Sequence, residues 1–260
     1  MSFFSMDSPL MRFLNRMADL IVLNLLSILF SVPTLISGYL ALAIYGETGQ
    51  LPLVYLLITA LLSFPVGASL TALHTVLIKM VKNEEGYIVK GFFQAFRDNF
   101  FQATAIGLLA ASLTVLLIVD LLIVKGWFRA FFAAAGFLFY GMMLYVYPLQ
   151  ARFYNPVGKT IRNSLLMEIA AFPRTLLMMA VSAVAFLLIY FAGNYAIPIA
   201  LLFGISVPAY LQAVIYVPYF KRLEEKDPPA QEEEVSAEGK SGREHKQGME
   251  AGANSSSKQQ

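Results

Sequence analysis

The sequence predicts an all-α, polytopic integral membrane protein, with about six transmembrane helices and short amphipathic helices on the cytoplasmic side. Three observations lead to this fold class. Of the 260 residues, 58% are hydrophobic and only 14% are charged, against about one quarter in soluble proteins. The apolar residues gather in six long runs. Lys and Arg flank these runs almost entirely on one side.

Each run reaches or approaches the length that crosses a bilayer. A hydrocarbon core of about 30 Å requires roughly 20 apolar residues as helix, and lipid offers no partner to unpaired backbone groups. The first run is interpreted as an uncleaved helix, because it is too long for a signal peptide and further spans follow it. Pro65, Pro148 and Pro208 predict kinks in the even-numbered runs. The runs cover residues 20–43, 52–78, 103–124, 128–149, 176–192 and 197–220.

The loops predict the orientation. The opposite side has only Lys125 and Arg129 in one turn, so the positive-inside rule places both termini in the cytoplasm of a multi-pass plasma-membrane protein, expected to be bacterial. The basic residues on the inner side are Arg12, Arg16, Lys79, Lys82, Lys90, Arg97, Arg152, Lys159, Arg162, Arg174, Lys221 and Arg222.

Composition divides the chain into a membrane domain, residues 1–222, and an acidic tail, residues 223–260, that is expected to be disordered and cytoplasmic. The domain has fourteen Lys and Arg against eight Asp and Glu, a net charge of +6, whereas the tail has five against nine, a net charge of −4. The tail is either solvated without a fixed partner or shields the basic inner face.

The connector between the second and third runs predicts an amphipathic helix that starts near Ile88. Its phenylalanines share one arc with Ile88, and Lys90 lies on the other side. We expect either a contact with a partner protein or an arc that dips into the bilayer or packs under the helix bundle. The candidate partner contact consists of Phe92, Phe93, Phe96, Arg97, Asn99 and Phe100.

Two further segments have a weaker version of this pattern. One precedes the first run, with Pro9 at the first helical position. The other precedes the fifth run, where Ile161, Leu165 and Ile169 form an apolar stripe. The three segments suggest a repeated unit of an interfacial helix and two crossings, although any hairpin membrane protein with basic inner loops would look similar.

The second run has one polar face that recurs every four residues. This spacing allows close helix packing, with hydroxyls bonded to a neighbour, or it lines a solute pathway. The face consists of Ser63, Gly67, Thr71 and Thr75, with His74 beside it. Ser69 and His74 cannot form a hydrolytic pair, because five residues along a helix rotate the side chains about 140° apart.

Asp120 lies near the outer end of the third run. A carboxylate there is costly unless it is paired, so we predict a buried ion pair with Lys125 and Arg129, the alternative being a proton-coupling role.

No catalytic, cofactor-binding or metal-binding residues are expected. The chain has no cysteine, no HExxH motif and no phosphate-binding GxxxxGK[ST] loop. We therefore expect a protein that is not an enzyme, whose surroundings are the lipid bilayer, and which has no nucleic-acid partner.

The first hundred residues resemble the YesL-like family of bacterial membrane proteins, and the remainder resembles it in topology only. The matching positions are Asn24, Pro33, Gly67-Ala68-Ser69, Thr71-Ala72-Leu73 and Phe96-Arg97-x-Asn99-Phe100. The family has no established activity, and its members are found beside carbohydrate uptake systems. The resemblance implies a non-enzymatic accessory or regulator, with a carbohydrate ABC transporter permease as a possible partner. The alternative is a small-solute transporter or channel that uses the polar face of the second run. The oligomeric state stays open.

Overall fold

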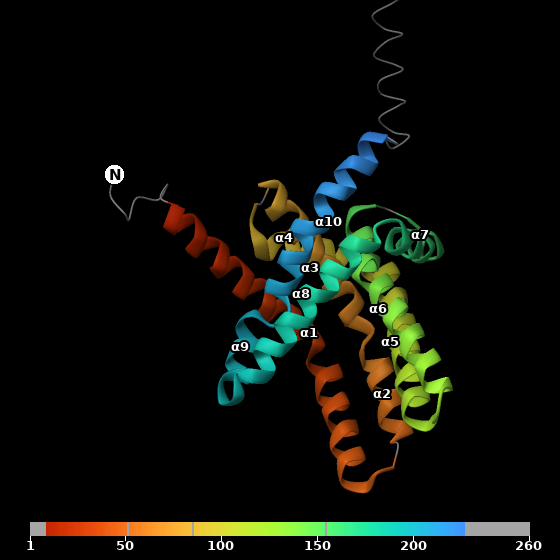
Figure 1. Cartoon of the computed structure of the whole chain (residues 1–260). Helices are drawn as coiled ribbons and strands as arrows, with labels where there is room; N and C mark the ends of the chain where they lie inside the picture. The colour runs from red at the N-terminus through yellow and green to blue at the C-terminus, as the bar shows by residue number, and fades with distance from the viewer. Residues whose placement is uncertain (1–8, 51, 85, 154, 227–260) are drawn as a thin grey trace, which may run out of the picture. The chain divides into compact units, whose positions relative to one another are not determined.

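The computed structural model describes residues 9–50, 52–84, 86–153 and 155–226. Helices and one 3-10 turn form these parts of the chain, which contain no strand, so the predicted all-α class is confirmed (Figure 1). The elements are α1 (Pro9–Thr48), α2 (Leu53–Leu62), α3 (Phe64–Lys82), α4 (Ile88–Asp98), α5 (Phe100–Ile123), α6 (Phe128–Arg152), α7 (Val157–Ala170), α8 (Phe172–Phe191), the turn Gly193–Tyr195, α9 (Ala196–Phe203) and α10 (Ser206–Lys226).

Five helices, α1, α3, α5, α6 and α8, are long and apolar enough to cross a membrane. A sixth candidate is the pair Gly193–Phe203 and Ser206–Glu224, which bends by 56° at its break. The predicted run 52–78 is also divided, because α2 ends before Ser63 and α3 begins with Pro65 in its first turn. Pro148 interrupts no helix, since α6 continues through it.

The described part of α1 runs from Pro9 to Thr48, 40 residues without a break. The interfacial segment expected before the first run is therefore the first part of the same helix. The segments before the third and fifth runs do form separate helices, α4 and α7.

Helix α3 lies at the centre of the bundle, where it packs against α1, α4, α5 and α6. Its C-terminal end stops at Asn83, which has a left-handed backbone with φ 55°. The Arg16 guanidinium of α1 donates to the Met80 carbonyl at 3.3 Å, to Asn83 Oδ1 at 2.9 Å and to the Tyr210 hydroxyl at 2.9 Å. A cation at a helix C-terminus is favourable, so Arg16 stabilises this end of α3.

The chain divides into two compact units, Met1–Ile215 and Tyr216–Gln260. The described part of the second unit is the end of α10, in which the rings of Tyr216 and Phe220 lie 5.1 Å apart. The described part of this helix extends to Lys226, beyond the boundary at 222 that composition predicts. The remainder of the predicted tail lies outside the described residues.

Candidate functional site

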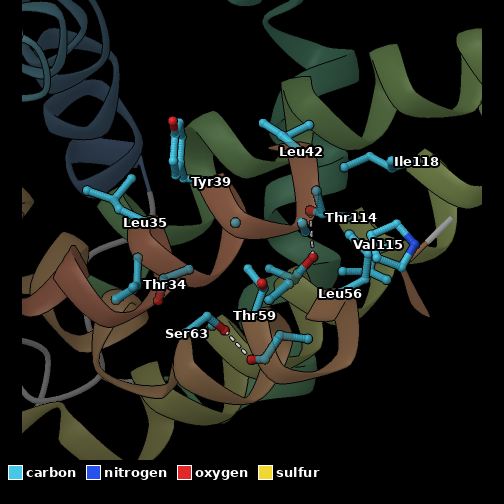
Figure 2. A pocket seen from close by; sticks show the side chains of 18 of the residues that line it. Thr34, Leu35, Tyr39, Leu42, Leu56, Thr59, Ser63, Thr114, Val115 and Ile118 are labelled. Carbon is cyan, nitrogen blue, oxygen red and sulfur yellow. Dashed lines mark hydrogen bonds between the residues drawn. The ribbon is translucent and has the colours of Figure 1, made fainter. Parts of the chain in front are cut away.

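One candidate site is a cavity of about 650 Å³ between α1, α2, α5 and α6. Figure 2 shows Leu35 and Tyr39 of α1 on one side and Val115 and Ile118 of α5 on the other. Carbon atoms make up most of its wall. The cavity therefore suits an apolar molecule or acyl chain better than a hydrated one.

The serine and threonine hydroxyl groups around this cavity are already bonded to the protein. Ser63 donates to the Ala60 carbonyl at 2.6 Å (Figure 2), and Thr114 donates to the carbonyl one turn earlier at 2.8 Å. Thr59 lies 2.7 Å from the Ser37 hydroxyl. A sugar needs several donors and acceptors from its site, and hydroxyls satisfied in this way offer few.

Helix α1 also stabilises both helix breaks. At the α2–α3 break, Thr34 donates to the Leu62 carbonyl at 2.9 Å, which would otherwise lack a partner at the end of α2. The α9–α10 break is held by the side-chain amide of Asn24. This amide donates to the Ala200 and Leu201 carbonyls at 3.1 and 2.7 Å, and its oxygen accepts the N–H groups of Ile205 and Ser206 at 2.8 and 2.9 Å.

The predicted polar face of the second run is part of α3, and most of it is buried. Gly67 contacts α5 so closely that a Cβ there would overlap the Ala103 carbonyl and lie 2.9 Å from Gly107 Cα. Ser63 borders the cavity, His74 is 7% exposed, and Thr71 is fully buried. The last residue of the face, Thr75, donates to the Thr71 carbonyl at 2.9 Å. The α3–α5 contact is thus a close approach of two backbones through small residues.

The predicted contact helix α4 is divided between an inner and an outer face. Phe92 is fully buried, and Phe96 stacks on Phe30 of α1 with ring centroids 4.4 Å apart. On the outer face, Phe93 is 45% exposed and Arg97 is exposed. Phe100 and Asn99 are half-buried. Part of the predicted contact therefore packs under the bundle, and the surface available to a partner is smaller.

The predicted ion pair at the outer end of α5 is not formed in this structure. Asp120 is half-buried, whereas Lys125 and Arg129 are exposed, and no ion pair joins them within the described ranges. Lys125 lies in the turn between α5 and α6, and Arg129 lies in the first turn of α6.

Sequence reasoning missed a polar group on α7. Thr160, Ser164 and Glu168 recur every four residues and are each at most 1% exposed, whereas Leu165 and Ile169 of the predicted apolar stripe are 45% and 65% exposed. The Thr160–Ser164–Glu168 spacing was the available signal. The sequence of α7 alone does not show whether its polar or its apolar face is buried.

Gln150 of α6 connects this polar group to α5. Its amide nitrogen donates to Gln102 Oε1 at 2.7 Å, and its oxygen accepts the Thr160 hydroxyl at 3.1 Å. Close by, Tyr145 lies 3.1 Å from Thr175, whose hydroxyl donates to the Glu168 carbonyl at 3.2 Å. The described residues contain no cluster of three or more His, Asp or Glu side chains that could hold a metal ion.

These features define a helical protein with five or six helices of membrane-spanning length, an apolar cavity and buried polar contacts between helices. Residues 20–121 match a family model described as a protein of unknown function, DUF624. The chain is also similar to the uncharacterized protein YteU of Bacillus subtilis (strain 168), with 29% identity over 170 residues, which cover 62% of this chain and 74% of YteU. No solved structure matches the chain. The matched range includes Asn24, Thr34 and the Gly67–Gly107 contact.

Proposed function

We propose that this chain is a non-enzymatic accessory or regulatory protein of the plasma membrane that acts by binding a carbohydrate ABC transporter permease. The observation that carries the proposal is the division of α4. Phe92 and Phe96 stack on Phe30 of α1. Phe93 meets Phe30 only edge-on, with ring centroids 6.3 Å apart, and is 45% exposed, and Arg97 is exposed. A helix that packs on the protein through one face and exposes aromatic and basic side chains on the other suits docking to a partner. The resemblance to YesL-like proteins supplies the class of partner.

The test is whether the protein loses its binding to the permease when the positive charges of α4 are removed. The full chain is purified in mild detergent from cells that express the permease, as wild type and as the Lys90→Gln, Arg97→Gln double variant. We expect the permease to co-purify with the wild type and to be lost with the variant. Both side chains are exposed, so the fold should persist.

The matched control is Lys125→Gln with Arg129→Gln, which removes two exposed cations elsewhere on the chain. This control should keep the permease. If both double variants retain the permease equally, the α4 surface is not the contact. If neither the wild type nor any variant binds it, the accessory function is wrong.

A second candidate function is transport of a small solute. The broken pairs α2–α3 and α9–α10 favour it, because discontinuous helices often border transporter sites, and the α2–α3 break borders the 650 Å³ cavity. The wall chemistry restricts this candidate to an apolar solute. Purified protein in liposomes would move or bind such a solute alone, whereas an accessory protein would be inert without its permease.

The proposed topology has both termini in the cytoplasm and the turn at Glu47 outside. Since the chain has no cysteine, single cysteines at Glu47 and Gln260 can be labelled separately in intact cells with an impermeant thiol reagent. We expect labelling at Glu47 only. Labelling at Gln260 from outside would contradict this orientation.

A further inference from the structure

The side chain of Glu168 is a buried carboxyl without a partner. It lies in the last turn of α7, is 1% exposed, and neither oxygen has a hydrogen-bond partner. Helix α7 is not one of the helices of membrane-spanning length, and it packs against α5, α6 and α8. A polar group buried in this way is costly, and a charged one far more so.

The carboxyl fits because position 141 of α6 is a glycine. A Cβ at Gly141 would overlap Glu168 Oε1 and would lie 2.8 Å from both Glu168 Cδ and Met179 Cε. The carboxyl is therefore enclosed by the bare backbone of α6 and a thioether side chain of α8. Neither surface compensates a negative charge.

The charged and titratable groups around α7 do not compensate a negative charge on Glu168 either. On α7 itself, Lys159 and Arg162 are exposed. Tyr145 of α6 is directed to Thr175 rather than to the carboxyl. Arg152 of α6 and Arg174 of α8 form no ion pair with Glu168 in the described ranges. On α5, the Gln102 side chain is a neutral amide and is bonded to Gln150.

We propose that Glu168 is a proton-binding site, in which the neutral carboxylic acid holds α7 against Gly141 of α6 and loss of the proton to water releases α7. The O–H bond breaks with its electron pair on the carboxylate, and the released proton goes to solvent. The carboxylate then requires hydration, which this site does not provide. Burial raises the pKa of Glu168 above its ordinary value of 4.5, in agreement with the geometry.

The contribution of this contact to the stability of the protein should fall as the pH rises. Well below pH 4.5 the carboxyl is protonated in both folded and unfolded chains, so the contact contributes fully to stability. As the pH rises, the unfolded chain loses this proton first, and the contribution falls until the raised pKa of the folded chain is passed. Glu168→Gln keeps the shape without the ionisation, so it removes this part of the pH dependence.

The first experiment measures the thermal unfolding midpoint of the full chain in detergent between about pH 5 and about pH 8. We expect the midpoint of the wild type to fall with pH relative to that of Glu168→Gln. Gly141→Ala should lower it at every pH by displacing the carboxyl. The matched control is Gly136→Ala on the same helix, where an added Cβ would meet no other atom within 4 Å. This control should leave the unfolding midpoint unchanged. Parallel curves for the wild type and Glu168→Gln would overturn the proposal.

A second measurement uses only the wild-type chain, so it tests proton binding at Glu168 even if the variants do not fold. Hydrophobic carbodiimides modify protonated carboxyls in apolar surroundings, and mass spectrometry locates the adduct. We expect an adduct at Glu168 whose yield falls as the pH rises, and little adduct at the exposed Glu84. A folded chain that gives no adduct at Glu168, or an adduct of constant yield across the pH range, would show that the site does not exchange a proton.

Discussion

Helices α4 and α7 each precede a long apolar helix, and each has an amphipathic sequence, yet they turn opposite faces to the protein. Helix α4 buries Phe92 and exposes Arg97. Helix α7 buries Ser164 and Glu168 and exposes Ile169. The same kind of sequence pattern thus predicts a helix in both places but not which side of it the protein covers.

The partners of the two helices explain the difference. Helix α4 meets Phe30 of α1, whose ring stacks with Phe92 and Phe96, so burial of the aromatic side of α4 is favourable. Helix α7 meets Gln150 of α6, which offers an amide to Thr160. We infer that acyl chains cover the outer face of α7, because lipid accepts apolar side chains that water would not.

The largest effect is expected at the inner face of α4. Phe92→Ala removes a fully buried ring and should destabilise the protein by about 3–5 kcal/mol. Phe101→Ala removes a ring that is 87% exposed and is the control, with little change. The measurement is the unfolding midpoint of both variants in detergent. Equal losses would mean that α4 does not pack on α1 as described.

An intermediate effect is expected where α7 meets α6. Gln150→Leu leaves both Gln102 and Thr160 without their partner and should cost about 1–3 kcal/mol. The matched control is Gln94→Leu on the exposed face of α4. Denaturation of both variants in the same detergent compares them. If Gln150→Leu were as stable as the control, the polar contacts of α7 would not hold it to α6.

The smallest effect on stability is expected at the outer face of α7. Ile169→Asn changes a side chain that is 65% exposed and should alter stability by no more than about 0.5 kcal/mol. In vesicles, however, it should weaken contact with lipid, measured by quenching of a probe on α7 by brominated acyl chains. A large loss of stability in detergent would place Ile169 inside the protein.

The sequence predicted the helices better than the contacts between them. Length and apolar composition are enough to predict α5, α6 and α8. The break at Ser63 and the bend before Ser206 depend on Thr34 and Asn24, which lie far away in the sequence. The bonds that Thr34 and Asn24 make to these breaks could not be predicted from the sequence of any single run.

The candidate site was predicted less completely for a related reason. The polar face of α3 could be recognised from its spacing, but its contact with α5 depends on Gly107, a residue forty positions later. Glu168 was missed because nothing in its own helix identifies Gly141 as the surface that receives it. The residue pattern of one helix does not predict the shape of the helix surface against which it packs.

The most direct test of the opposed faces uses single cysteines with spin labels in lipid vesicles, which the absence of native cysteine allows. Labels at Ile169 and Arg97 report the outer faces of α7 and α4, and labels at Ser164 and Phe92 report the inner faces. Collisions with lipid-soluble oxygen should be frequent at Ile169, and collisions with a water-soluble nickel chelate frequent at Arg97. Both reagents should reach the two inner positions rarely. Frequent oxygen collisions at Ser164 together with protection of Ile169 would show that α7 is turned the other way and would contradict the account.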